Sequence, residues 1–187
     1  TRNTTEAINL VAYSLGKKFF KEGDHILVSR AEHHSNFLPW QMLSQEKGAV
    51  LDIVDLDEKG ELTPEAVRRA LHPRTRLAAF THISHVLGTI YPVQKIGHVL
   101  HEKNVLFLLD AAQSAAHTPL DVRVIGCDFL AFSGHKMGGP MGIGVLYGKE
   151  NLLKEMSPFL RGGGMIREVR IENTLWDGPP YKFEAGT

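Results

Sequence analysis

The chain contains the sequence Phe129-Leu130-Ala131-Phe132-Ser133-Gly134-His135-Lys136, an apolar run that stops in a small polar turn with one primary amine. An earlier apolar run, Val105-Leu106-Phe107-Leu108-Leu109-Asp110, ends in a carboxylate. Both runs have the length and composition of buried β-strands. An amine and a carboxylate that each end a buried strand favour an enzyme over a purely structural protein.

Apolar runs and helix signals alternate along the chain. Asn3-Thr4-Thr5-Glu6 has the spacing of a helix capping box, and Thr63-Pro64-Glu65 combines an N-cap with a first-turn proline. We expect helices over residues 4–20, 36–47, 63–71 and 92–103, and strands over residues 25–29, 50–54, 77–84, 105–110, 129–133 and 144–147. This alternation predicts an α/β domain with a three-layer α/β/α architecture and a mostly parallel sheet. Residues 161–187, rich in Gly, Pro and aromatic residues, are expected to be irregular.

Such sheets bind ligands beyond the carboxyl ends of their strands, where Asp110 and Lys136 fall. An amine that can form an imine and a carboxylate that can pair with a ring nitrogen are the two anchors of a pyridoxal phosphate (PLP) site. Taken singly, Asp110 is better explained as a helix cap and Lys136 as an ordinary surface lysine. Ser133 and His135 add hydroxyl and imidazole donors suited to phosphate, so the set as a whole favours the PLP site.

Two further parts of the chain offer candidates for the same cofactor. Thr4 and Thr5 combine hydroxyl groups with the free N–H groups of a helix N-terminus, which is a phosphate site, although N-capping alone also accounts for them. The pair His33-His34 follows the first expected strand. We expect His34 to stack on the cofactor ring, and a solvated loop histidine is the alternative.

The ten histidines raise the question of a metal site. His98 and His101 lie three residues apart on an expected helix, but no third ligand has the spacing of a known zinc motif. His82 and His85 are separated by an odd number of residues on an expected strand, so their side chains should point to opposite faces. We therefore expect no metal.

The composition narrows the class of protein. A chain of 187 residues with 43% hydrophobic content is most simply one domain. Lys and Arg total 21, as do Asp and Glu, so no charge excess indicates nucleic acid or an anionic membrane. The apolar runs are shorter than the roughly 20 residues that span a bilayer. The single cysteine, Cys127, excludes a disulfide within this chain. Small-molecule chemistry in the cytoplasm fits these features.

Six motifs follow one another along the chain: Thr4-Thr5-Glu6-Ala7-Ile8-Asn9, Glu32-His33-His34-Ser35-Asn36 with Pro39-Trp40, Asp110-Ala111-Ala112-Gln113, Ser133-Gly134-His135-Lys136, Gly139-Pro140-Met141-Gly142-Ile143-Gly144 and Phe183-Glu184-Ala185-Gly186-Thr187. Their order and spacing closely resemble the class V aminotransferase family, and within it the group II (SufS-like) cysteine desulfurases and selenocysteine lyases. The resemblance spans the chain and implies the large domain of a PLP-dependent transferase of fold type I.

The resemblance also implies roles for single residues. Lys136 would hold PLP as an imine and, once freed by the substrate, abstract the α-proton. Asp110 would pair with the pyridine nitrogen, and Gln113 would hydrogen-bond the phenolic oxygen. His34 would stack on the ring and help to move protons.

Phosphate binding and subunit assembly are implied in the same way. Thr5, Ser133 and His135 would bind the phosphate, and Thr187 would reach the phosphate held by the partner subunit of a homodimer. The implied reaction removes sulfur from L-cysteine, giving L-alanine and an enzyme persulfide. A sulfur-acceptor protein of iron–sulfur cluster assembly would then be a partner.

The chain departs from the family pattern in two respects. His85 stands where the family usually has Asn; it can still donate a hydrogen bond towards the cofactor oxygen. The persulfide cysteine and the arginine that binds the substrate carboxylate lie, in the family, in a small domain beyond the Phe-Glu-Ala-Gly-Thr motif, where this chain stops. Cys127 does not match the persulfide position and is expected to be a buried structural thiol.

Residues 1–187 are therefore expected to be the central part of the PLP-binding domain, without the N-terminal segment and the C-terminal small domain, and to be catalytically incomplete in isolation. Two alternatives remain at this stage. One is another class V enzyme, such as a selenocysteine lyase, a cysteine sulfinate desulfinase or an epimerase. The other is an inactive fragment that binds only PLP or a partner subunit.

Overall fold

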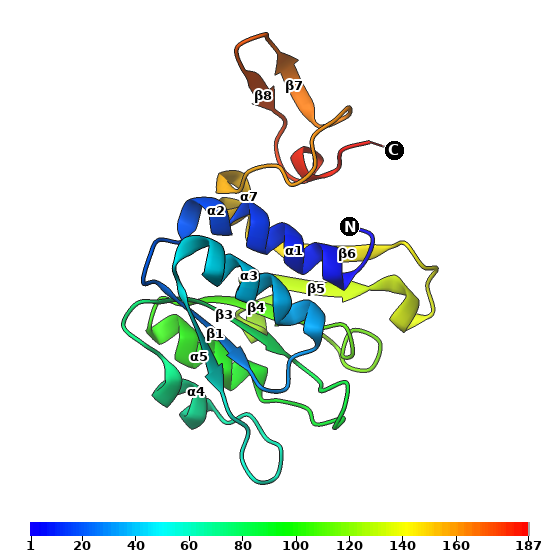
Figure 1. The fold of residues 1–187 in the computed structure, drawn as a ribbon. Coiled ribbons are helices and arrows are strands. Elements are labelled where there is room, and N and C mark those ends of the chain that lie inside the picture. Colours follow the sequence, from blue (N-terminus) through cyan, green and yellow to red (C-terminus); the bar gives the residue numbers. More distant parts are fainter. Residues whose placement is uncertain (187) are drawn as a thin grey trace.

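The computed structural model describes residues 1–186, which form a six-stranded sheet and a separate hairpin (Figure 1). The strands of the sheet lie in the order β2-β1-β3-β4-β5-β6; β1 to β5 are parallel and β6 is antiparallel to β5. Their bounds are β1 His25–Ser29, β2 Val50–Val54, β3 Thr75–Thr81, β4 Leu106–Asp110, β5 Phe129–Ser133 and β6 Gly144–Gly148. The predicted parallel sheet is confirmed, and β1, β2 and β5 begin and end at the predicted residues.

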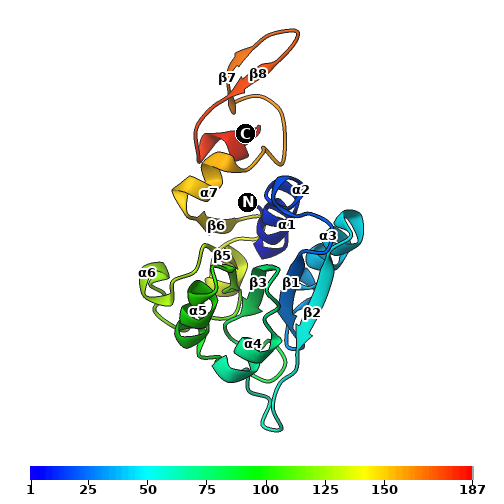
Figure 2. The ribbon, with the colours of Figure 1, turned by 90° about the vertical axis from the view of Figure 1, so that its left-hand side faces the viewer.

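Helices cover both faces of this sheet (Figures 1 and 2). Helices α1 and α3 pack on one face, and α4 and α5 pack on the other. The helices are α1 Thr4–Ser14, α2 Gly16–Phe19, α3 Leu38–Lys47, α4 Pro64–Ala70, α5 Val93–Glu102, α6 Val122–Ile125 and α7 Glu150–Glu155. The three-layer α/β/α architecture is therefore the predicted one. Within residues 1–186, no helix combines the length and the apolar character that crossing a membrane requires.

The strands divide their side chains between two hydrophobic clusters. In β1, Ile26 and Val28 join the cluster beneath α1 and α3, whereas Leu27 joins the cluster beneath α4 and α5. All three are fully buried. Successive side chains of a strand point to opposite faces, so a continuous apolar run supplies both cores. This explains why the middle residues of the central strands are apolar, with polar residues only towards the strand ends.

Some elements differ from the prediction. The expected helix over residues 4–20 is interrupted at Leu15, where Gly16 lies so close to α3 that an added Cβ would sit 2.6 Å from the Leu43 side chain. Strand β3 ends at Thr81, so His85 lies in a loop and not on a strand. The short helices α6 and α7 were not predicted, because four and six residues are too few for a helical period to emerge.

The last part of the described chain is more ordered than predicted. Strands β7 (Ile166–Val169) and β8 (Thr174–Trp176) pair as an antiparallel hairpin, and a short 3-10 helix follows at Tyr181–Phe183. The hairpin projects away from the sheet (Figures 1 and 2), which is why its residues lack the apolar alternation of a buried strand. Thr187 lies outside the described residues.

Candidate active site

A cavity of about 200 Å³ lies at the carboxyl ends of β3, β4 and β5. It is lined by residues from the ends of these strands, from the start of α1 and from the loops that follow β1 and β3: Asn3, Thr4, Thr5, His33, Ser35, Thr81, His85, Asp110, Ala112, Gln113, Ser133, His135 and Lys136. Ligand sites in open α/β sheets occur at this edge. The cavity thus brings together residues that are up to 133 positions apart in the chain.

The first turn of α1 forms one wall of the cavity. Asn3 caps the helix, since its side chain accepts a hydrogen bond from the Glu6 N–H at 2.8 Å. The Thr4 N–H donates to the Ser133 hydroxyl at 2.8 Å, and the hydroxyl groups of Thr4 and Ser133 are 2.7 Å apart. In residues 1–186 the Thr5 N–H has no hydrogen-bond acceptor. An unpaired N–H at a helix N-terminus is suited to an anionic ligand.

Asp110 supplies the buried acid. Its side chain is 3% exposed, and Oδ1 accepts a hydrogen bond from the Ala112 N–H at 2.9 Å. Burial raises the pKa of the Asp110 carboxyl, and the Ala112 N–H and the charge of Lys136 oppose that rise. No hydrogen bond to Oδ2 occurs among the described residues, so this oxygen can accept one from a ligand.

Lys136 lines the same cavity as Asp110 and lies in a tight turn after β5. This turn is a short 3-10 helix, Gly134–Met137, and both His135 and Lys136 are exposed. An added Cβ at Gly139 would lie 2.9 Å from the Gly134 carbonyl oxygen, so the turn can close only without a side chain there. The sequence therefore places an accessible amine on a constrained backbone beside a buried carboxylate.

The structure places the two consecutive histidines differently. His33, and not His34, lines the cavity, and its ring meets the ring of His85 edge to face with centroids 4.8 Å apart. His33 has an extended backbone, and its Nδ1 accepts a hydrogen bond from the Ser35 N–H at 3.1 Å, which turns its ring inward. His34 begins a 3-10 helix and is exposed.

Neutral His33 is favoured in this position. Burial lowers the pKa of the His33 imidazole, and the neighbouring His85, Lys136 and His34 lower it further. A neutral imidazole can present a flat ring face to a ligand without placing a further cation beside Lys136.

Most of the predicted site residues meet in the cavity. Those that line it are Thr4, Thr5, His85, Asp110, Gln113, Ser133, His135 and Lys136. His34 does not, and Thr187 lies outside the described residues. The sequence prediction missed His33, Ser35 and Thr81. No local sequence signal distinguished His33 from His34, because a pair of adjacent histidines contains no periodicity that would separate them.

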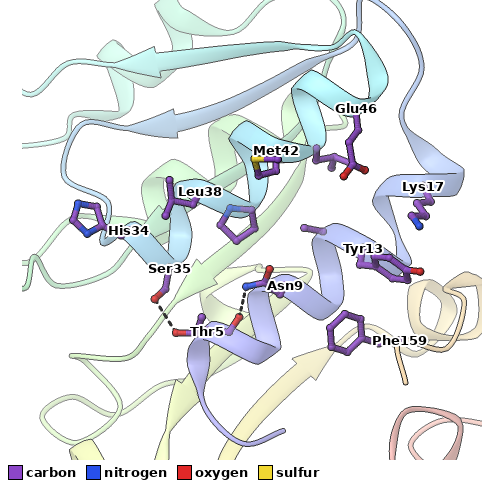
Figure 3. A pocket seen from close by; sticks show the side chains of 13 residues that line it. Thr5, Asn9, Tyr13, Lys17, His34, Ser35, Leu38, Met42, Glu46 and Phe159 are labelled. Atoms are coloured by element: carbon purple, nitrogen blue, oxygen red, sulfur yellow. Dashed lines mark hydrogen bonds between the residues drawn. The ribbon is translucent and has the colours of Figure 1, made fainter. Parts of the chain in front are cut away.

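A larger cavity of about 410 Å³ lies between α1 and α3 (Figure 3). Its walls are mainly apolar and include Leu38, Met42 and Phe159, and His34 lies at its rim. Thr5 and Ser35 line both cavities, and their hydroxyl groups are hydrogen-bonded at 2.8 Å. The larger cavity contains neither the buried carboxylate nor the constrained amine, so the smaller one is the candidate active site.

Known proteins resemble the whole described chain. A model of the family Aminotransferase class-V matches residues 1–187. A probable cysteine desulfurase of Synechocystis sp. is 50% identical over 187 residues, which are 100% of this chain and 44% of that protein. The crystal structure of the cysteine desulfurase CsdA from Escherichia coli superposes with a TM-score of 0.97 at 41% identity, covering 100% of this chain and 47% of that one.

A more distant structure carries a cofactor. A mutant of C-DES with glycine covalently linked to its PLP cofactor has a TM-score of 0.89 and 27% identity to this chain, covering 100% of this chain and 50% of the other. The chain spans less than half the length of the curated relatives that it matches, between 27% and 46% of each.

Proposed function

Because the chain belongs to the aminotransferase class V family, whose model matches it from residue 1 to residue 187, we propose that it carries the PLP-binding site of a cysteine desulfurase. The observation that carries the proposal is the convergence of Lys136 and Asp110 on one cavity at the carboxyl ends of β4 and β5. The high identity to proteins named cysteine desulfurase supports the choice of reaction.

The residues present fit this cofactor at three points. The amine of Lys136 is exposed, as covalent attachment to an aldehyde requires. The free Oδ2 of buried Asp110 suits a protonated ring nitrogen. The Thr5 N–H at the start of α1, which has no acceptor among the described residues, suits a phosphate, and His135 and Ser133 line the same cavity.

When bound, PLP supplies an electron sink for negative charge that develops at the substrate α-carbon. The protein residues would hold the cofactor in place and would donate or accept the protons. Asp110 would keep the ring nitrogen protonated, and Gln113 and His85 would donate hydrogen bonds to the phenolic oxygen. Lys136 would accept the α-proton of the substrate, and His33 would pack on the ring and help to move protons.

The activity of the whole protein is part of the same proposal. We propose that it removes sulfur from L-cysteine as a SufS-like enzyme of the cytoplasm, forming L-alanine and passing the sulfur as a persulfide to an acceptor protein of iron–sulfur assembly. Residues 1–187 would be the central part of the PLP domain. The persulfide cysteine would lie in a further domain, and Thr187 would contribute to the site of the partner subunit in a homodimer.

Borohydride reduction tests the cofactor assignment. We expect the protein, incubated with PLP and then reduced, to gain the mass of one phosphopyridoxyl group, and peptide mapping to place this group on Lys136. The Lys136→Ala variant should lose the adduct, whereas Lys103→Ala, at an exposed position before the amino end of β4, should retain it. An adduct that persists in Lys136→Ala, or none in the wild type, would contradict the assignment. Release of alanine from L-cysteine tests the reaction separately.

A further inference from the structure

A second carboxylate, that of Glu32, lies immediately behind the cavity and next to His33 in the chain. Its Oε1 accepts hydrogen bonds from the Thr81 N–H at 3.1 Å and from the Ser29 hydroxyl. Ser29 and Thr81 are the last residues of β1 and β3. One side of the carboxylate therefore joins the carboxyl ends of two neighbouring strands.

The other side of the carboxylate faces Asn36. The Asn36 Nδ2 group donates to Glu32 Oε2 at 2.6 Å, and the Trp40 Nε1–H donates to Asn36 Oδ1 at 3.2 Å. Asn36 and Trp40 are fully buried. An indole N–H can only donate, so it fixes the orientation of the Asn36 amide with the NH₂ group towards Glu32.

These contacts require an acid at position 32 and exclude its amide. Each carboxylate oxygen meets a group that can only donate: the Thr81 N–H at Oε1 and the Asn36 NH₂ at Oε2. A glutamine would offer one oxygen and one NH₂ group, so one of the two donors would face another donor. The Ser29 hydroxyl is the one partner that can reverse its direction.

The network surrounds the peptide that presents His33 to the cavity. It ties this peptide to β1, β3 and, through Asn36 and Trp40, to α3. We infer that Glu32 and Asn36 form a polarity-matched pair that positions His33, and that Glu32 is a positioning residue of the active site. The inference rests on the proposed function in assigning the His33 ring to the cofactor.

The ionisation of Glu32 is compatible with this role. Burial raises the pKa of the Glu32 carboxyl to about 8, and the charge of Asp110 adds to the rise, while Ser29, Asn36 and Thr81 oppose it. In the neutral acid the hydrogen can lie on Oε1 and point to the Ser29 hydroxyl. Both oxygens then still accept from Thr81 and Asn36, so the pair is maintained in either protonation state.

Exchange of acid and amide tests the pair. In Glu32→Gln one buried donor loses its acceptor, and in Asn36→Asp two carboxyl groups meet at the 2.6 Å contact. In the double variant, the introduced glutamine would accept from Thr81 and donate to the introduced aspartate, whose second oxygen would accept from Trp40. At pH 5, where Glu32 is largely protonated in the folded protein, we expect each single variant to lower the folding equilibrium constant by roughly tenfold to a hundredfold, and the double variant to recover most of that loss.

The position of His33 needs a readout of its own. In the cofactor-free protein, modification by diethyl pyrocarbonate can be mapped at His33 relative to His34, which is exposed and serves as an internal reference. We expect the extent of modification at His33, divided by that at His34, to rise several-fold in Glu32→Gln. In the double variant this ratio should return towards the wild-type value. A purely structural loss of stability would not change this ratio under conditions where each variant remains folded.

Two results would overturn the inference: an unchanged ratio in folded Glu32→Gln, or a double variant that is no better than the worse single variant. If Glu32→Gln does not fold, the stability and the modification ratio of Asn36→Asp are compared with those of the double variant, and the same criteria apply. Failure of the wild type to attach PLP at Lys136 would refute the proposed function alone, because the His33 measurement is made without cofactor.

Discussion

The backbone N–H of Thr4 lies 2.8 Å from the hydroxyl oxygen of Ser133 and donates a hydrogen bond to it across 129 positions of the chain. This bond fastens the N-terminus of α1 to the carboxyl end of β5. The positive end of the helix dipole thereby lies at the same edge of the sheet as Lys136. In the proposed site, this contact would hold the helix N-terminus that binds the phosphate beside the amine that attaches the cofactor.

Removal of the Ser133 hydroxyl should weaken both folding and cofactor binding. In Ser133→Ala the buried Thr4 N–H loses its acceptor, which costs about 1–3 kcal/mol of unfolding free energy. Urea denaturation measures this loss, and titration with PLP measures the affinity. Ser157→Ala, at an exposed serine, is the matched control and should behave as the wild type. Equal stability of Ser133→Ala and Ser157→Ala would show that the contact does not fasten α1.

A methyl group at Gly144, the first residue of β6, should displace the start of α1 from the sheet by a different route. The Gly144 N–H donates to the Thr1 carbonyl at 2.7 Å, and an added Cβ would lie 2.5 Å from Asn3 Cα. Because the obstructing atoms are backbone, Gly144→Ala must displace the start of α1, at a cost of about 1–3 kcal/mol. Gly163→Ala is the control, since an added Cβ there meets no atom within 4 Å. Thermal unfolding of both variants, with PLP affinity, distinguishes a local clash from a general effect of losing glycine.

The sheet was predictable because each strand is specified by residues that are neighbours in the sequence. An apolar run such as β5 is bounded by a polar turn, and alternate side chains fill the two cores, so composition alone marks the strand. The cavity followed from the rule that parallel strands end at one edge. The choice of His33 over His34 was not predictable, because it depends on a hydrogen bond from the Ser35 N–H that turns one ring inward. Exposed strands such as β7 also lack the burial pattern that marks a strand.

Glu32 should make stability depend on pH in a defined direction. Its pKa rises from 4.5 in the unfolded chain to about 8 in the folded protein, so between these values the folded state binds the extra proton. The stabilisation is complete below pH 4.5 and is lost as the pH rises towards 8, by up to about 1.4 kcal/mol per pH unit. Because other groups also titrate, the difference in unfolding free energy between the wild type and Glu32→Gln isolates this residue. The advantage of the wild type over Glu32→Gln should fall steadily from pH 5 to pH 8 and reverse in sign within that range, because the loss summed over three pH units exceeds the cost of the substitution. A constant or growing advantage would contradict the raised pKa of Glu32.

Cys127 should take no part in sulfur transfer. Its side chain is fully buried, and burial raises the pKa of the thiol to about 12, so almost none of it is thiolate at neutral pH. Since the thiolate is the nucleophile that accepts sulfur, we expect iodoacetamide to leave Cys127 unmodified in the native protein and to alkylate it after denaturation in urea. Mass spectrometry after incubation with PLP and L-cysteine should likewise find no persulfide on the peptide that contains Cys127. A persulfide at that residue would mean that the loop before β5 opens during turnover, and the acceptor would then not need to lie in a further domain.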